Sequence, residues 1–290
     1  MAGTDVLAVI EWFDRHRRDL PWRREPRDPW AVLVSEVMLQ QTPVSRVLPA
    51  YRAWLERWPG PDELAAAPSG EAVRQWGRLG YPRRAIRLHA AAVAVVSRFG
   101  GTMPQDYDQL RSLPGVGDYT ASAVLAFAHR RRVPVLDTNV RRVLVRAGRG
   151  LAAPSGSSPS RLERAMAVAV LPEEPESAAH ASEALMELGA LVCRSRNPEC
   201  DACPLQESCL WWALGRPDHG LPAGRQPGYA GSDRQARGAI MAVLRDAAGP
   251  VDQGTIDDAW PDPVQRRRAQ ESLRVDGLLE VKGELVTLPL

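Results

Sequence analysis

Two acidic residues, Glu36 and Asp137, stand in surroundings that suit acid–base chemistry. Glu36 lies inside an almost wholly apolar stretch, residues 30–39, where loss of hydration favours the protonated carboxyl group. Asp137 follows a short apolar run and precedes an expected helix, whose N-terminus favours the anion. One neutral and one charged carboxyl group can split a glycosidic bond through a cation-like sugar, so we interpret the pair as an active site. The alternatives are that Glu36 lies on an exposed stripe of its helix and that Asp137 is only an N-cap.

A glycine-rich turn, Pro114-Gly115-Val116-Gly117, separates two expected helices. Two glycines around one apolar residue let the backbone turn tightly and leave amide groups free where the next helix begins. Free amides at a helix N-terminus form a site for a phosphate group. Together with the acidic pair, this turn suggests an enzyme that acts on the backbone or sugar of a nucleic acid, although an ordinary helix–turn–helix connection explains the turn equally well.

The four cysteines form one compact group near residue 200. They are spaced C-x6-C-x2-C-x5-C, as Cys193, Cys200, Cys203 and Cys209. Such grouping is unlike a secreted disulfide framework and predicts a metal centre. Four thiolates hold either a structural zinc ion or an iron–sulfur cluster. Zinc is the commoner occupant, but zinc sites usually present two C-x2-C pairs and this chain has one, so the spacing leaves the metal open.

The 290-residue chain has a net charge of only +2, and its basic residues are arginines except Lys282. Arginine favours bidentate contact with phosphate, whereas GC-rich coding explains the lack of lysine equally well. Most of the arginine clusters are expected to be solvated faces, and a minority are expected to contact DNA. The clusters are residues 15–18, 83–84, 130–132, 141–142 and 266–268. Neither a signal peptide nor a transmembrane span is evident, so we expect a cytoplasmic protein.

Apolar periodicity predicts a mainly α-helical chain up to about residue 210. The expected helices cover residues 5–17, 30–40, 43–57, 71–77, 83–98, 106–112, 118–129, 138–148, 160–170 and 178–192. Glycine, proline and polar residues then predict a linker over 213–233. Helices at 234–247, 255–260 and 263–276, followed by strands at 278–281 and 285–288, predict a winged-helix-like module over 234–290.

Five separated motifs together resemble one family. In chain order they are SEVMLQQT at 35–42, LGY at 79–81, LPGVGDYTA at 113–121, LDTNV at 136–140 and the four cysteines. They resemble the helix–hairpin–helix DNA glycosylases, and specifically their A/G-specific adenine glycosylase (MutY-type) branch, over residues 18–212. The resemblance implies a mainly α fold of two helical lobes with DNA between them. A six-helix barrel domain would cover 30–137, and an iron–sulfur domain would cover 138–212 together with the N-terminal segment, 1–29.

The resemblance also implies roles for individual residues. Glu36 would protonate the adenine ring, Asp137 would stabilise the sugar cation, and Tyr119 and Asn139 would steady that intermediate and its water. The cysteines would hold a 4Fe–4S cluster, and the family allows a monovalent cation at the hairpin. The residues implied to bind DNA or the extruded base are Arg18, Leu20, Trp22, Arg23, Gln40, Gln41, Tyr81, Gly115, Val116, Gly117 and Glu183. Of these, Trp22 and Tyr81 are equally well explained as core aromatics and Arg23 as a surface charge.

Tyr119 distinguishes the chain from its lyase relatives. Glycosylase–lyases resembling endonuclease III place a Schiff-base lysine at this position. Because this chain has a tyrosine there, we expect a monofunctional enzyme that leaves an abasic site for other repair enzymes. We also expect the enzyme to be a monomer. Its expected partner is double-stranded DNA containing A:8-oxoguanine or A:G. The family usually carries a C-terminal lobe that resembles MutT/Nudix proteins and surrounds 8-oxoguanine. The segment of residues 234–290 is too short to form such a lobe. Removal of thymine or uracil from mismatches with G is the main alternative, and a non-catalytic DNA-binding protein is a remoter one.

Overall fold

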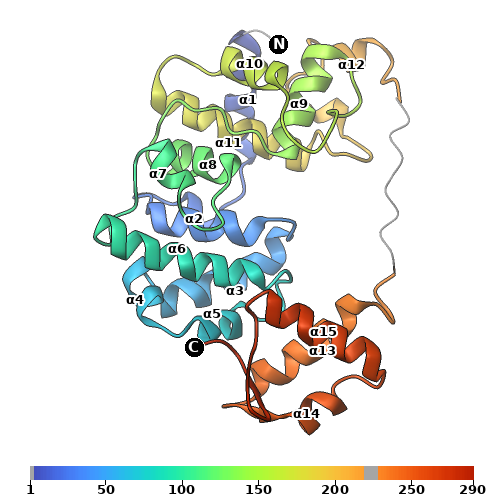
Figure 1. Cartoon of the computed structure of the whole chain (residues 1–290). Helices are drawn as coiled ribbons and strands as arrows, with labels where there is room; N and C mark the ends of the chain where they lie inside the picture. The colour runs from blue at the N-terminus through green and yellow to red at the C-terminus, as the bar shows by residue number, and fades with distance from the viewer. Residues whose placement is uncertain (1–2, 219–227) are drawn as a thin grey trace. The chain divides into compact units, whose positions relative to one another are not determined.

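The computed structural model describes residues 3–218 and 228–290 (Figure 1). The chain is mainly helical, as its sequence predicts, and it divides into two compact units. The first unit contains residues 1–32, 105–111 and 116–223, and the second contains 33–104, 112–115 and 224–290. The domain boundaries implied by the resemblance stay a prediction.

Nearly all helices lie where the apolar periodicity places them. In the first unit they are α1 (Gly3–His16), η1 (Pro21–Arg23), α7 (Tyr107–Arg111), α8 (Asp118–Phe127), α9 (Thr138–Arg149), α10 (Arg161–Val170), α11 (Pro175–Leu191), η2 (Cys200–Ala202) and α12 (Leu210–Ala213). Helix α2 (Pro29–Leu39) runs from the first unit into the second. The second unit continues with α3 (Val44–Arg57), α4 (Pro61–Ala66), α5 (Ser69–Trp76) and α6 (Arg83–Phe99).

Four short helices are not predicted by the sequence, namely η1, α4, η2 and α12. Helix α4 nevertheless carries a clear start signal. Gly60 is its N-cap, Pro61 occupies the first turn, and the Glu63 carboxylate accepts a hydrogen bond from the Gly60 amide at 3.0 Å. Proline fits at this position because the first amide of a helix has no acceptor in the helix. Periodicity alone overlooks such helices because they have six residues or fewer, less than two helical turns.

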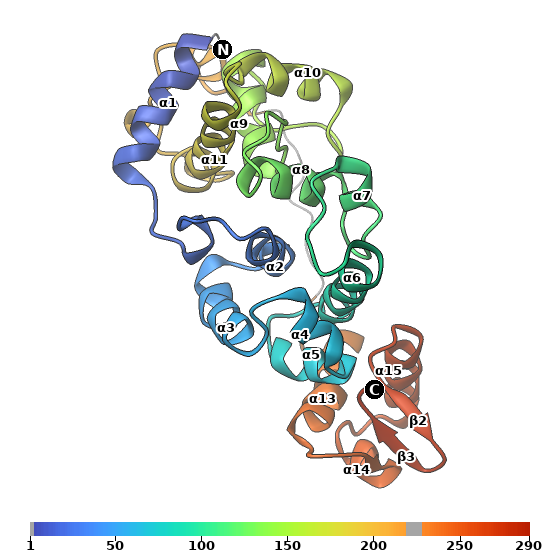
Figure 2. The ribbon, with the colours of Figure 1, turned by 90° about the vertical axis from the view of Figure 1, so that its left-hand side faces the viewer.

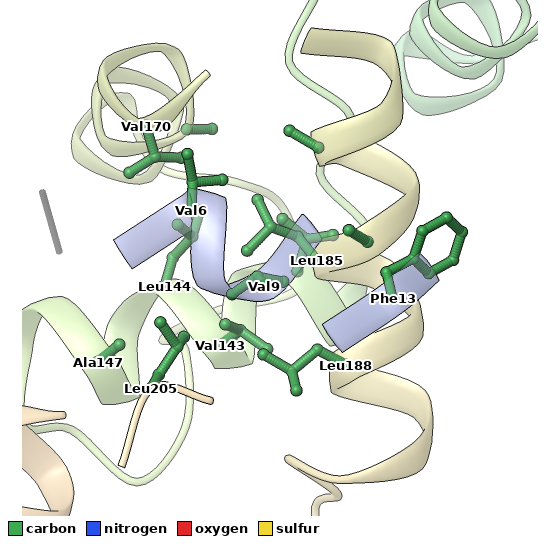
Figure 3. Packing of buried hydrophobic residues seen from close by; sticks show 14 of the residues in the cluster. Val6, Val9, Phe13, Val143, Leu144, Ala147, Val170, Leu185, Leu188 and Leu205 are labelled. Atoms are coloured by element: carbon green, nitrogen blue, oxygen red, sulfur yellow. The ribbon is translucent and has the colours of Figure 1, made fainter. Parts of the chain in front are cut away.

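The core of the first unit joins α1 to α9 and α11 (Figure 3). The expected apolar face of α1 is buried through Val6, Val9 and Phe13. Its partners include Leu144 of α9 and Leu188 of α11, which are both completely buried. Burial of each such side chain contributes about 2 kcal/mol. The N-terminal helix therefore packs with segments more than 100 residues further along the chain, and α9 is held by this packing on one of its faces.

Aromatic packing defines much of the second unit. Trp54 of α3 contacts Trp58 and Trp76 edge to face, with ring centroids 4.8 and 5.6 Å away. Contacts of this geometry add to the stabilisation from area burial. Trp76 ends α5 immediately before the turn that leads into α6. The tryptophan group therefore anchors the base of the turn that carries Tyr81.

Residues 228–290 form the winged-helix-like arrangement that the sequence predicts. Helix α13 (Asp233–Asp246), strand β1 (Val251–Asp252), α14 (Gln253–Asp258), α15 (Pro263–Val275), β2 (Glu280–Lys282) and β3 (Leu285–Thr287) follow in order. The antiparallel sheet has the order β1-β3-β2, and Figure 2 shows β2 beside β3 in this module. Strand β1 was not predicted, because two residues carry no alternating pattern. In α15, Arg266 pairs with Asp257 at 3.0 Å and Arg268 with Asp233 at 2.9 Å.

This C-terminal module belongs to the second unit. The Gly70 amide of α5 donates to the Pro289 carbonyl at 2.8 Å, and Arg83 pairs with Asp276 at 3.2 Å. Of the linker predicted at 213–233, residues 219–227 lie outside the described residues. Within the described parts of the chain, each helix is too short or too polar to cross a lipid bilayer.

Candidate active site

Asp137 caps the N-terminus of α9 and holds Asn139 beside it. One carboxylate oxygen accepts from the Val140 amide at 2.6 Å, and the other accepts from Asn139 Nδ2 at 2.7 Å. The N-cap interpretation is therefore correct. The helix terminus was expected to favour the anion, but burial outweighs it and raises the pKa of this carboxyl above its ordinary value. The two hydrogen bonds and the Arg142 charge lower the pKa again, but burial is the larger effect.

Arg142 connects Asn139 to the first cysteine. Its Nη2 donates to Asn139 Oδ1 and to the Gly189 carbonyl, both at 2.7 Å, and its Nε donates to the Cys193 carbonyl at 2.7 Å. Gly189 must be a glycine here, because a Cβ would lie 2.7 Å from the Asn139 Cβ. The chain of contacts from Asp137 through Asn139 and Arg142 reaches the backbone of Cys193. The candidate catalytic aspartate and the candidate metal centre therefore share one rigid support.

The arginines of α9 were expected on a solvated or DNA-facing surface, and the structure corrects this. Arg141, Arg142 and Arg146 are 2%, 8% and 4% exposed. Arg141 pairs with the buried Glu163 at 2.9 Å, and Arg146 donates to the Arg194 carbonyl at 2.7 Å. The spacing of Arg142 and Arg146, four residues apart, is the only sequence signal that marks them as one helix face.

The four cysteines are half-buried and form no disulfide. Cys193, Cys203 and Cys209 pack against the core of the first unit. Burial raises the pKa of the Cys203 thiol to about 12, and the other three thiols act in the same direction. Among the residues that the structure describes, no group of three or more His, Cys, Asp or Glu side chains has the geometry of a metal-ion site.

Glu36 is buried in the last turns of α2, with 5% of its surface exposed. The alternative of an exposed stripe is therefore excluded, and the carboxyl group is in the desolvated surroundings that the sequence predicts. Glu36 belongs to the second unit and Asp137 to the first. Tyr119, also in the first unit, is half-buried in the opening turn of α8.

A group of arginines and glutamates surrounds the residues expected to hold the extruded base. Arg18 Nη2 and Arg23 Nη2 contact the Glu187 carboxylate at 2.7 and 3.0 Å. Glu183, one turn earlier in α11, pairs with Arg27 at 2.6 Å, and both side chains are at least 95% buried. The sequence analysis missed Arg27 and Glu187. The carboxylates at 183 and 187 are four residues apart in the apolar second half of α11, and this spacing is the signal that marks them as a pair.

An open cavity of about 900 Å³ lies beside this group in the first unit. Arg18, Leu20 and Arg23 line this cavity. Trp22 is buried and does not line it, and the Glu183 carboxylate pairs with Arg27. The Trp22 side chain is thus a core aromatic, as one interpretation held. Of the residues expected to hold the extruded base, Arg18, Leu20 and Arg23 therefore lie together at one cavity. Arg27 adds a positive charge to the wall of this cavity.

The hairpin between α7 and α8 contains the predicted tight turn. Gly115 has a φ of +80°, and a Cβ there would lie 2.8 Å from the Arg87 Cβ, so both backbone conformation and space require glycine. Gly117 is the N-cap of α8, with open space at its Cα. Val116 is buried, which turns its side chain away from solvent. The hairpin therefore has the exposed glycine backbone that a phosphate contact requires.

Gln41 and Tyr81 are exposed residues in left-handed backbone conformations. Their φ values are +55° and +48°, and Tyr81 is 57% exposed. Non-glycine residues adopt this region rarely, and strained positions cluster at functional sites. Tyr81 is therefore not a core aromatic. Gln40, beside Gln41, is half-buried, and its carbonyl accepts from Arg84 at 2.6 Å.

Comparison with known proteins identifies the superfamily of the chain. Residues 34–170 match the HhH-GPD superfamily of base excision DNA repair proteins. A solved thermostable thymine-DNA glycosylase superposes with a TM-score of 0.65 at 25% identity, over 73% of this chain and 96% of that one. The protein is thus a DNA N-glycosylase of base excision repair.

Two mycobacterial proteins define the family more closely. The chain is 52% identical to the adenine DNA glycosylase of Mycolicibacterium smegmatis over 94% of its own length and 92% of that protein. It is 48% identical to the adenine DNA glycosylase of Mycobacterium tuberculosis, over 96% and 90% of the two lengths. The chain belongs to the family of adenine DNA glycosylases.

Proposed function

We propose that this enzyme removes adenine from double-stranded DNA in which adenine is mispaired with 8-oxoguanine or guanine. It hydrolyses the N-glycosidic bond and leaves an abasic site. The observation that carries the proposal is the Asp137–Asn139 pair at the N-terminus of α9, in a chain whose relatives are named for adenine. Tyr119 stands where a lyase needs an amine nucleophile, which supports a monofunctional reaction.

Glu36 and Asp137 perform different tasks in the proposed reaction. Glu36, buried in α2, protonates the adenine ring and so improves the leaving group. Asp137 in its ionised form stabilises the oxocarbenium-like sugar. Burial weakens hydration of the Asp137 anion and raises its pKa, so the carboxylate interacts strongly with a positive charge that develops beside it. The hydrogen bonds from Val140 and Asn139 orient both carboxylate oxygens before the reaction begins.

The remaining site residues bind DNA. Arg18, Leu20 and Arg23 in the cavity wall contact the extruded adenine, with Trp22 and Glu183 supporting them. Gln41 and Tyr81 enter the duplex as the base leaves it, and Gln40 beside them contacts DNA. The amides of Gly115, Val116 and Gly117 bind a backbone phosphate, and a monovalent cation at the hairpin stays a prediction.

The four cysteines are proposed to hold a 4Fe–4S cluster. Four thiolates close together in the chain are the usual ligands of such a cluster, and the four half-buried cysteines form no disulfide. When bound, the cluster supplies a structural anchor for the segment 193–209. Arg146 Nη1, 3.4 Å from Cys193 Sγ, partly offsets the negative charge of the thiolates.

We further propose that the enzyme acts as a monomer on nucleoid DNA in the cytoplasm. Its product, an abasic site, must pass to an enzyme that processes such sites. The charge pattern supports a DNA-binding role, since arginines dominate the cavity wall of the first unit.

The decisive experiment incubates the purified protein with duplexes containing A:8-oxoguanine, A:G, T:G or U:G and then cleaves abasic sites with alkali. We expect adenine release that disappears in Glu36→Gln and in Asp137→Asn but persists in Glu271→Gln, whose exposed carboxylate pairs only with Arg274 among described residues. Release of thymine from T:G that survives Glu36→Gln would favour a thymine glycosylase. Strand cleavage without alkali would contradict the monofunctional reaction. A colourless protein with zinc and no iron would exclude the cluster.

A further inference from the structure

Arg84, in the first turn of α6, is a buried arginine that bonds to neutral oxygens. Only 7% of its surface is exposed. Its Nη1 donates to the carbonyls of Val37, Met38 and Gln40 at 2.9, 3.0 and 2.6 Å. Its Nη2 donates to Thr42 Oγ1 and to the Gly80 carbonyl, both at 3.0 Å. Burial lowers the pKa of Arg84 to about 10, which leaves the guanidinium charged at neutral pH.

These five acceptors belong to two separate turns of the second unit. Val37 and Met38 are near the end of α2, where the last carbonyls of a helix lack partners within it. Gln40 and Thr42 flank Gln41, and Gly80 precedes Tyr81. The Arg84 guanidinium also lies over the rings of Trp76 and Tyr81, 5.1 and 5.7 Å from their centroids.

Both turns expose one residue in a left-handed conformation. These are Gln41 and Tyr81, and such conformations persist only where the surroundings hold them in place. The turn at Tyr81 has a second support, since Trp76 Nε1 donates to the Gly80 carbonyl at 3.0 Å. The turn at Gln41 has Thr42 Oγ1, which donates to the Gln40 carbonyl at 3.2 Å. Arg84 bonds to both turns, and Thr42 Oγ1 adds a longer contact across them, 3.5 Å from the Leu79 carbonyl.

We propose that Arg84 is a positioning residue for base extrusion, which fixes the turns of Gln41 and Tyr81 in one arrangement. This inference rests on the proposed function, in which these two side chains enter the duplex. A planar guanidinium can reach several carbonyls at fixed angles, whereas a lysine has one nitrogen and cannot serve both turns. Arg84 contacts neither DNA nor the reacting atoms, and it acts only through the two turns.

The test compares two substrates that differ in the cost of extruding adenine. One is an A:8-oxoguanine duplex, and the other holds the same adenine in a bulge flanked by unpaired bases. An unpaired base costs less to extrude, so a positioning defect should matter less on the bulge. We expect Arg84→Met and Arg84→Lys to slow single-turnover release from the duplex by about tenfold to a hundredfold, and from the bulge by less than about threefold.

Matched variants separate positioning from chemistry and from folding. Gln41→Ala and Tyr81→Ala should show the same dependence on substrate, and Glu36→Gln should slow both substrates equally. In a Gln41→Ala/Tyr81→Ala double variant, the further change Arg84→Met should slow adenine release only slightly, because the two side chains that Arg84 positions are then absent. The folding control is Arg74→Met, which removes a guanidinium bonded to the Ala247 carbonyl at 2.6 Å in the same unit. Melting temperatures show whether its stability loss matches that of Arg84→Met.

Several outcomes would overturn the inference. Equal losses of Arg84→Met on both substrates, no loss at all, or full additivity with the double variant would each exclude a positioning role while leaving the proposed function intact. A wild-type protein that releases adenine from neither substrate would instead reject the proposed function. If Arg84→Met does not fold, Arg84→Lys carries the same comparison, because it keeps the charge and most of the side-chain volume.

Discussion

Replacing Glu187 by glutamine should cost much of the enzyme's stability. The Glu187 carboxylate accepts from Arg18 and Arg23. Although burial opposes ionisation, these bonds lower its pKa from 4.5 to about 2. At about 1.36 kcal/mol per unit of pKa, this difference corresponds to about 3 kcal/mol in favour of the ionised folded protein. Arg18 is 35% exposed, so solvent screening makes this an upper value.

The pH dependence of the stability loss in Glu187→Gln gives a sharper test than the size of that loss at one pH. Because the folded pKa of Glu187 is lowered, its contribution is fully present above the unfolded pKa of 4.5 and is lost as pH falls towards 2. The difference in unfolding free energy between wild type and Glu187→Gln should therefore be about 3 kcal/mol at about pH 7 and about 1 kcal/mol at about pH 3. Urea unfolding, followed by circular dichroism at each pH, measures both values.

Glu271→Gln is the control for this series. Glu271 pairs with Arg274 on the surface, with 57% and 55% of the two side chains exposed, and exposed pairs contribute little. Its variant should unfold at the same urea concentration as wild type at both pH values. A Glu187→Gln variant as stable as this control would refute the reasoning. So would a stability loss that is the same at low and neutral pH, since the loss would then arise from packing and not from charge.

Three further predictions follow from buried contacts. Asp137→Asn should abolish activity and remove a pH dependence of stability, because the raised folded pKa makes the unfolding free energy of wild type fall as pH rises through it. A wild-type stability curve parallel to that of the variant would contradict this. Arg142→Met should lower the free energy of unfolding by about 2–4 kcal/mol and reduce the iron content of the protein, since it removes the support shared by Asn139 and the cysteine segment. An unchanged melting temperature and an unchanged iron content would refute this. Gly70→Ala should destabilise by about 1–3 kcal/mol, because its Cβ would lie 2.4 Å from the Pro289 carbonyl; an unchanged melting temperature would contradict it.

Local patterns predicted the features that depend on neighbours in sequence. The helices, the hairpin glycines, the cysteine group and the burial of Glu36 all follow from the types and spacing of nearby residues. The conformation of Gly115 is an example, because a tight turn before a helix needs a positive φ wherever it occurs. Such features can be predicted without knowing which segments meet in the fold.

Features that depend on long-range contacts could not be predicted in this way. Arg18 and Glu187 are 169 residues apart in the chain and bond through three hydrogen bonds. The pKa of Asp137 depends on a balance between a local effect, the helix terminus, and a tertiary one, burial. The local effect was visible in the sequence, and the larger tertiary effect was not. The direction of the shift was therefore predicted wrongly.

The arginine-rich composition has a structural explanation that neither DNA binding nor coding bias supplies. Arg84, Arg142 and Arg146 are all buried, and each donates to carbonyls from at least two segments. Such carbonyls lie at helix ends and turns, where the backbone leaves acceptors without donors. A lysine has one nitrogen on a flexible stem and would leave some of these acceptors unpaired. Arginine is therefore required at these three positions even where no phosphate approaches, so the number of arginines overstates the surface available to DNA.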